Sequence, residues 1–216
     1  AAAEMLGDTL QIVQALNNIG TNYRRLAILD EASSYHYQAL TYCDQYSGNL
    51  SGDRTARKNR VVSLNGIGNV QLTMGNMDEA ENAFRQALEG ERLLGSELGQ
   101  AINYANIGSI MEAREMIDSA RYYYGKSLEL NQEAGSELGV SLCRAHFGRL
   151  AENAGDYVTA IDEYKQAYDI MEGSTDVWHW LESAVSLVRV YINAGNLERA
   201  SFYLARAEKE AERISS

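Results

Sequence analysis

Glycine and large apolar positions recur along the chain with a period of 40 residues. Gly68, Gly108 and Gly148 each follow a large apolar residue, and an alanine comes twelve positions after each of them. A fifth copy keeps this alanine as Ala200 and carries Val188 at the glycine position. Self-similarity at such a period is typical of solenoids, in which each repeat buries its apolar face against its neighbours. The pattern therefore predicts one continuous array of repeats.

Each repeat is predicted to contain two amphipathic helices. In repeat two, apolar residues at spacings of three and four run from Val61 to Met74 and again from Ala80 to Leu88, as on one face of a helix. Gly75–Asn76 separates these runs and is typical of a helix C-cap and turn. The equivalent dipeptides are Ala27–Ile28, Glu115–Met116, Gly155–Asp156 and Gly195–Asn196.

The junctions between repeats define five two-helix segments. Gly95–Ser96 and Gly135–Ser136 each pair a glycine that ends one helix with a serine that caps the next. Gly7–Asp8 stands where the first such junction falls, so residues 1–7 are expected to end a helix of a preceding repeat, and the chain is expected to be a fragment. The repeats are predicted at about residues 8–47, 56–95, 96–135, 136–175 and 176–214, with an insertion within residues 47–60.

The repeated residues resemble the signature of the tetratricopeptide repeat family. In repeat two the matching residues are Ile67–Gly68, Ala80, Phe84 and Ala87, and the resemblance covers about residues 8–213. It implies an all-α fold, a right-handed superhelical α-solenoid of about five helical hairpins. The 40-residue repeat exceeds the family's usual length of about 34 residues, and the chain has no proline. Both features resemble the longer-repeat branch, and the junctions resemble repeat regions of bacterial sensor kinases and transcription regulators.

The small residues have a mechanical reason in this arrangement. Gly68 and Ala80 are expected to let two helices approach where a larger side chain would clash. Large residues sixteen positions after each glycine position are expected to fill the space between hairpins; they are His36, Phe84, Tyr124, Tyr164 and Leu204.

Charge and apolar content narrow the classes of partner. The net charge of −11 and the pI near 4.8 argue against nucleic acid, since phosphate binding needs a cationic surface. They also disfavour an anionic membrane surface. No apolar run approaches the roughly 18 residues that a membrane-spanning helix needs, so direct membrane insertion is not expected.

Cys43 and Cys143 lie in distant repeats and are expected to be free thiols, which leaves a cytoplasmic or periplasmic location open.

The resemblance implies that partners lie along the first helix of each repeat, which lines the concave face in this family. Amide side chains there can pair with an extended peptide backbone, and arginines favour a carboxylate. The alternative is that these are polar residues that simply face solvent. The candidate binding residues are Asn17, Thr21, Arg24, Asn65, Asn69, Ser109, Arg149, Asn153, Arg189 and Asn193.

Two other motifs allow a binding or a structural interpretation. The insertion carries a basic run that includes Arg54 and Arg60. It either docks an acidic partner or extends the first helix of repeat two with Asp53 as its cap, and the extension is favoured. Trp178 and Trp180 could form a binding hot spot. The favoured alternative is that one fills the seam between repeats four and five while the other lies on the surface.

Catalytic chemistry is not indicated. Cys143 and His146 share a helix face and could form a thiolate–base pair or two metal ligands. No third ligand or orienting carboxylate accompanies them, so a packing role is favoured. Each glycine stands singly at a repeat position, which does not make a phosphate-binding loop. We expect no cofactor, no metal site and no enzymatic activity.

The sequence therefore predicts a non-catalytic scaffold that binds a protein or peptide. The favoured setting is the sensing or interaction region of a larger bacterial signalling protein. A free-standing adaptor and a self-associating module that forms homo-oligomers are the two alternatives.

Overall fold

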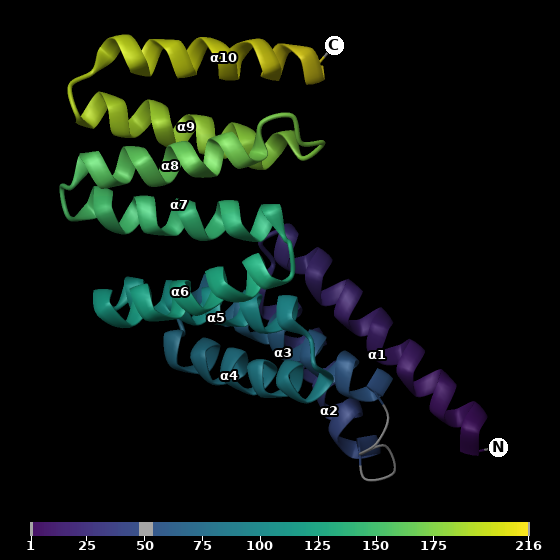
Figure 1. The fold of residues 1–216 in the computed structure, drawn as a ribbon. Helices are drawn as coiled ribbons and strands as arrows, with labels where there is room; N and C mark the ends of the chain where they lie inside the picture. The colour runs from purple at the N-terminus through teal and green to yellow at the C-terminus, as the bar shows by residue number, and fades with distance from the viewer. Residues whose placement is uncertain (1, 48–53, 216) are drawn as a thin grey trace. The chain divides into compact units, whose positions relative to one another are not determined.

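The computed structural model describes residues 2–47 and 54–215, which are helical apart from short connections (Figure 1). Helices with 3.6-residue apolar periodicity were predicted throughout, and the all-α class is confirmed. The helices within these ranges are α1 (Ala2–Arg25), α2 (Leu29–Ser47), α3 (Arg54–Met74), α4 (Met77–Leu94), α5 (Glu97–Ala113), α6 (Ile117–Glu133), α7 (Glu137–Asn153), α8 (Tyr157–Met171), α9 (Val177–Asn193) and α10 (Leu197–Ser215).

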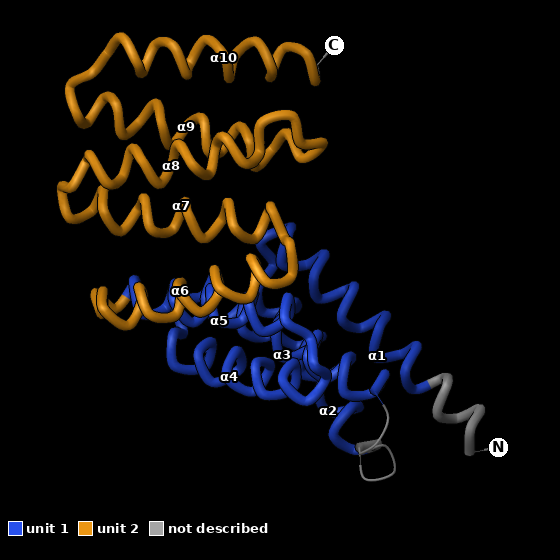
Figure 2. Tube along the Cα trace, viewed as in Figure 1, with its two compact units in different colours: residues 1–113 blue, residues 114–216 orange. Residues whose placement is uncertain are grey.

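The chain divides into two compact units (Figure 2). Unit 1 covers residues 1–113 and holds α1 to α5, and unit 2 covers residues 114–216 and holds α6 to α10. The boundary falls inside predicted repeat three, between its two helices. A single array that continues across this boundary stays a prediction.

Aromatic rings of the second helix lie directly on glycines of the first helix. A Cβ added to Gly68 would lie 2.5 Å from Phe84 Cε1, and one added to Gly148 would lie 2.8 Å from Tyr164 Cδ1. The close approach of the two helices is therefore confirmed. The position of Leu204 was wrong: it is 46% exposed, and Tyr203 is buried instead. Repeat five has Val188 in place of the glycine on which a ring lies in repeats two and four.

The turns between paired helices have the predicted left-handed backbone. Gly75, Gly155 and Gly195 have φ values of 85°, 77° and 74°. Ala27 and Glu115, at the same positions of repeats one and three, both have a φ of 59°. This conformation places the Cβ of an L-residue close to the following carbonyl oxygen, so these two residues hold strained backbone.

The Glu115→Gly substitution is expected to raise the free energy of unfolding by about 1 kcal/mol, because glycine has no Cβ to clash in this conformation. Urea unfolding followed by circular dichroism measures the change. Gly155→Ala is the reverse control: it adds a Cβ at the equivalent turn and should lower the free energy of unfolding by a similar amount. Destabilisation by Glu115→Gly would show that the Glu115 side chain matters more than its backbone.

The predicted serine caps are present. Ser96 Oγ and Ser136 Oγ accept hydrogen bonds from the backbone N–H of Gly99 and Gly139, each at 3.1 Å. These bonds satisfy N–H groups that have no partner within the helix.

Two expectations in the N-terminal half have different outcomes. The predicted junction at Gly7–Asp8 is wrong, because α1 runs from Ala2 to Arg25 without a break. A lone glycine costs a helix only about 1 kcal/mol relative to alanine, which does not end it without other stop signals. In the insertion, residues 54–60 begin α3, in agreement with a helix extension. Residues 48–53 of the insertion, Asp53 among them, lie outside the described residues.

Candidate functional site

The first helices of repeats four and five, α7 and α9, lie side by side in unit 2 and enclose a groove of about 630 Å³. We call it the α7/α9 groove. Its walls include six side chains that carry the argument: Leu142, His146, Arg149, Trp178, Val185 and Arg189. Both helices come from the repeat position at which the resemblance places partners.

One end of the groove is apolar and open to solvent. Trp178 is 73% exposed, and Leu142 and Val185 are also exposed. The start of α9 is fixed beside them, because Asp176 accepts a hydrogen bond from the backbone N–H of His179 at 3.3 Å and contacts His179 Nδ1 at 2.7 Å. The hydrogen bond with His179 lowers the pKa of Asp176. A capped helix start thus presents Trp178 on the surface.

The other end is built around the carboxylate of Glu152. It accepts hydrogen bonds from Arg189 Nη2 at 3.0 Å, from Asn193 Nδ2 at 2.9 Å and from the Tyr164 hydroxyl at 2.8 Å. The guanidinium carbon of Arg189 lies 5.8 Å from the centre of the Tyr164 ring. Residues from α7, α8 and α9 therefore form one polar network.

The network sets the protonation states of its members. Burial opposes ionisation of Glu152, but the hydrogen bonds from Arg189, Tyr164 and Asn193 outweigh it and lower the pKa. Burial, together with the hydrogen bond to Glu152, raises the pKa of Tyr164 to about 12. At neutral pH the phenol therefore donates and the carboxylate is charged.

Arg149 and His146 form a second cluster in the groove. Arg149 Nη2 lies 3.3 Å from the Tyr124 hydroxyl and 3.1 Å from His146 Nδ1. The His146 ring stacks on Tyr124 with centroids 4.3 Å apart and an interplanar angle of 5°. A guanidinium only donates hydrogen bonds, so His146 Nδ1 is the acceptor in this contact.

Of the predicted binding residues in unit 2, three meet in this groove region. Arg149 and Arg189 line the groove, and Asn193 joins Arg189 through Glu152. Arg189 was expected to bind a carboxylate of the partner. Instead, Arg189 forms an ion pair with Glu152, because α7 and α9 bring the two side chains together. Asn153 is exposed at the end of α7.

Unit 1 places its predicted residues differently. Asn17 is 3% exposed; it donates to Ser63 Oγ at 2.9 Å, and its Oδ1 lies 3.0 Å from His36 Nδ1. Its assignment to a ligand surface was wrong, since this position turns into the interface with the neighbouring hairpin. Asn65 Oδ1 is buried and has no hydrogen-bond partner among the described residues. The remaining candidates are half-buried and stay predictions: Thr21, Arg24, Asn69 and Ser109.

The tryptophans and the two thiols have distinct surroundings. Trp180 is buried and contacts Tyr168 at a centroid distance of 5.1 Å, so it fills the seam while Trp178 lies on the surface, as favoured from the sequence.

Both cysteines are buried and free. Cys143 donates to Ser127 Oγ at 3.3 Å and not to His146, and burial raises the pKa of its thiol. The cysteine and histidine that share a helix face therefore contact different partners.

The tyrosine hydroxyls were not anticipated as parts of the site. Tyr124 and Tyr164 occupy the same register as Phe84, where a ring alone fills the space. A hydroxyl at a buried ring position needs a hydrogen-bond partner. The change from phenylalanine to tyrosine in repeats three and four was therefore the available signal for polar residues nearby.

Residues 59–133 match the family model of the tetratricopeptide repeat. No curated protein matches the chain. Among solved structures, BtubC (BKLC) from P. vanneervenii has a TM-score of 0.77 at 18% identity and aligns over 96% of this chain and 83% of that one. A Podosopora anserina putative kinesin light chain with nearly identical TPR-like repeats has a TM-score of 0.68 at 12% identity, over 96% of this chain and 99% of that one.

A third structure is much longer than the region it shares. Aspartyl phosphate phosphatase F from Bacillus subtilis has a TM-score of 0.66 at 17% identity and aligns over 93% of this chain and 49% of its own. Within the described residues, no helix is long and apolar enough to cross a membrane, and no cluster of three or more histidine, cysteine or acidic side chains is placed to hold a metal ion. The repeat pattern, the ring-on-glycine packing and these comparisons agree: the chain has the fold of tetratricopeptide repeat proteins, and residues 59–133 match the family's sequence model.

Proposed function

We propose that the chain is a non-catalytic scaffold that binds a short segment of a partner protein along the α7/α9 groove. The observation that carries the proposal is the exposure of Trp178 next to two other apolar side chains, Leu142 and Val185, within a groove of about 630 Å³. Clustered exposed apolar residues around an aromatic side chain mark interaction sites. A tryptophan held on a capped helix offers contact area at little cost in conformational entropy.

The polar end of the groove supports selectivity in this proposal. Because Glu152 pairs with Arg189, the charge of Arg189 is already balanced within the protein. Polar groups that already hold each other fix orientation without leaving buried charges unpaired when water is excluded. A partner segment fits both ends of the α7/α9 groove if it places an apolar side chain against Trp178 and a hydrogen-bonding group near Arg149.

The absence of catalysis is part of the proposal. What supports it is the state of the two thiols, the strongest nucleophiles in the chain. Burial raises the pKa of Cys43 to about 11 and also raises that of Cys143, which disfavours the reactive thiolate.

The proposed setting is the sensing or interaction region of a larger bacterial signalling protein. The fold shared with half of the aspartyl phosphate phosphatase F chain supports it, since there a similar helical array is one part of a longer protein. A free-standing adaptor and a self-associating module are the alternative functions. Sedimentation velocity over a range of protein concentrations would identify the self-associating module by a concentration-dependent mass.

Trp178→Ala is expected to weaken binding of peptides selected from a displayed library by about 30-fold, because hot-spot aromatics contribute about 2 kcal/mol or more. Fluorescence anisotropy of labelled peptides measures the affinity. The melting temperature should stay unchanged, since Trp178 is largely exposed. Leu197→Ala is the matched control, because Leu197 is 66% exposed on α10 and does not line the groove. Equal affinity of the Trp178→Ala variant and the unmodified chain would reject the groove as the binding site.

A further inference from the structure

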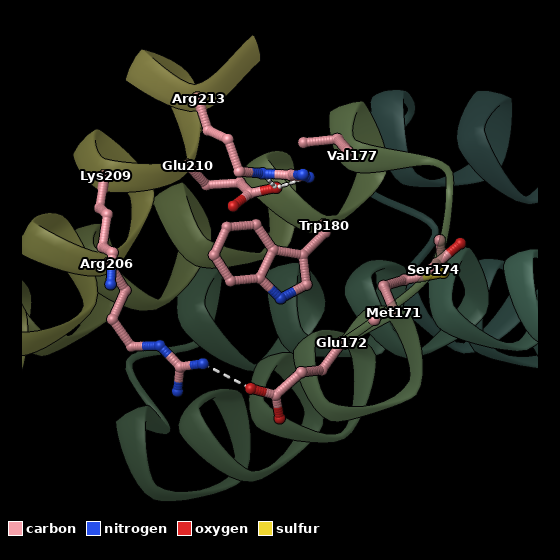
Figure 3. Close-up of a pocket in the computed structure, with 10 residues that line it drawn as sticks. Met171, Glu172, Ser174, Val177, Trp180, Arg206, Lys209, Glu210 and Arg213 are labelled. Carbon is pink, nitrogen blue, oxygen red and sulfur yellow. Dashed lines mark hydrogen bonds and ion pairs between the residues drawn. The ribbon is translucent and has the colours of Figure 1, made fainter.

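A second cavity of about 390 Å³ lies in unit 2 between the α8–α9 connection and α10 (Figure 3). It shares no lining residue with the α7/α9 groove. Met171, Val177 and Trp180 supply its apolar walls, and Arg206, Lys209 and Arg213 line it from one face of α10. We call it the Trp180 cavity.

The cavity exists because the connection from α8 to α9 is long. Residues 172–176 separate these helices, whereas residues 95–96 separate α4 from α5. Gly173 has a φ of 82°, which turns the chain after α8, and Ser174 holds the connection by accepting a hydrogen bond from the Asp176 N–H at 3.1 Å. The longer connection leaves a volume within the range of small-molecule sites, roughly 300–1,000 Å³.

One hydrogen-bond donor in the wall has no acceptor. Trp180 is 8% exposed, and its Nε1 is buried without a partner among the described residues. In Figure 3 the indole lies amid the lining side chains, with its nitrogen turned toward the side where Glu172 and Arg206 lie. A buried N–H without an acceptor costs about 1–3 kcal/mol, and a buried tryptophan N–H usually finds a partner. The unpaired Trp180 N–H therefore favours an occupant that carries a hydrogen-bond acceptor.

The charges around the cavity favour an anion. Arg206 pairs with Glu172, and Arg213 Nη2 lies 2.5 Å from Glu210 Oε1. Lys209 has no hydrogen-bonded carboxylate among the described residues. Three cations and two carboxylates line the cavity, which leaves one excess positive charge in a chain whose net charge is −11.

We propose that the Trp180 cavity binds a small organic acid with one carboxylate on an apolar body about the size of an aromatic ring. The carboxylate accepts the hydrogen bond of the Trp180 indole N–H and balances the charge of Lys209. The apolar body contacts Met171 and Val177. This small-molecule site is independent of the peptide groove proposed above.

The test uses the indole N–H itself as the reporter. The chain has two tryptophans, so a proton–nitrogen correlation spectrum shows two indole signals, which the Trp178→Phe variant assigns. Titration with 3-phenylpropionate is expected to shift the Trp180 indole proton downfield with saturation and to leave that of Trp178 in place. The neutral analogue 3-phenylpropionamide should bind about 10-fold more weakly, since a charge-assisted hydrogen bond is roughly twice as strong as a neutral one.

A pair of charge-matched variants on α10 locates the anion. Lys209→Gln is expected to raise the apparent Kd for 3-phenylpropionate about 10-fold, whereas Arg199→Gln, outside the cavity, should leave it unchanged. Thermal melts of both variants check that the fold is retained. An unmoved Trp180 signal, equal binding of acid and amide, or equal weakening by the two variants would each overturn the proposal.

Discussion

Gly68→Ala is expected to lower the free energy of unfolding by about 3 kcal/mol. The added Cβ would lie 2.5 Å from Phe84 Cε1 and 2.7 Å from Cδ1, far inside van der Waals contact. Phe84 is fully buried, so its ring has no free space into which to move. Forcing an extra carbon into a well-packed core costs roughly 1–3 kcal/mol, and the rigid ring places this site at the upper end. Urea unfolding followed by circular dichroism measures the loss.

Gly125→Ala is the matched control for this prediction. Gly125 also lies inside a helix, α6, but a Cβ added there meets no atom within 4 Å. The same substitution should therefore raise stability by about 0.5–1 kcal/mol through helix propensity alone. Phe84→Leu should recover part of the loss in Gly68→Ala, because a smaller side chain relieves the clash. A neutral Gly68→Ala would contradict the tight contact between α3 and α4.

Unit 1 is expected to lose about 3 kcal/mol of stability through His36 as the pH falls from 7 to 4. Burial, with a smaller effect from the charge of Arg24, lowers the pKa of His36 from 6.5 to about 4. Between these values the unfolded chain binds one proton more than the folded chain, so stability rises with pH. The contribution is complete above about pH 6.5 and is lost as the pH falls toward 4; each unit of pKa difference corresponds to about 1.4 kcal/mol.

The surroundings of the His36 ring explain why its charged form is so unfavourable. The ring lies between Gly20 of α1 and Gly66 of α3, where a Cβ added to either glycine would clash with the ring atoms. Nδ1 donates to Asn17 Oδ1 at 3.0 Å, because Asn17 uses its amide nitrogen for Ser63. Nε2 is buried and has no partner among the described residues. Protonation at Nε2 would place both a charge and an unpaired donor in the core.

The His36→Phe variant separates this effect from other titrations. Phenylalanine already fills the same register in repeat two, where Phe84 lies on Gly68. Urea midpoints measured from pH 4 to 7 should show a smaller slope for the variant than for the unmodified chain. Carboxylates such as Glu152, whose pKa is lowered, contribute to both slopes and cancel in the comparison. Equal slopes would show that His36 does not control the acid sensitivity.

Much of the fold could be predicted because its signals lie within single hairpins. Gly75, Gly155 and Gly195 mark turns through a backbone conformation that favours glycine. Two such turns lack glycine, yet Ala27 and Glu115 adopt the same conformation because the paired helices on either side require it. Gly7 shows the opposite error, since a glycine that resembles a junction lies inside α1. Local residue preferences are weak where the helices around them decide.

The candidate site could be predicted only in outline. The repeat register correctly placed Arg149 and Arg189 on adjacent first helices. It could not show that Glu152 pairs with Arg189 or that Asn17 is buried against Ser63. These outcomes depend on which side chains of different repeats come within hydrogen-bonding distance, and a register that treats every repeat alike carries no such information.

The sequence by itself determined the helical class, the 40-residue period, the turns and the close approach of paired helices at small residues, since each depends on side-chain size and backbone preference at fixed spacing within a hairpin. Only the tertiary structure decided which polar residues hold the interior together and which line a cavity. Trp178 and Trp180 illustrate the difference: the sequence favoured one tryptophan in the seam and one on the surface, and only the structure shows that Trp180 is the buried one. The reason is that a helix sets the direction of each side chain, whereas the neighbouring repeats determine what it meets.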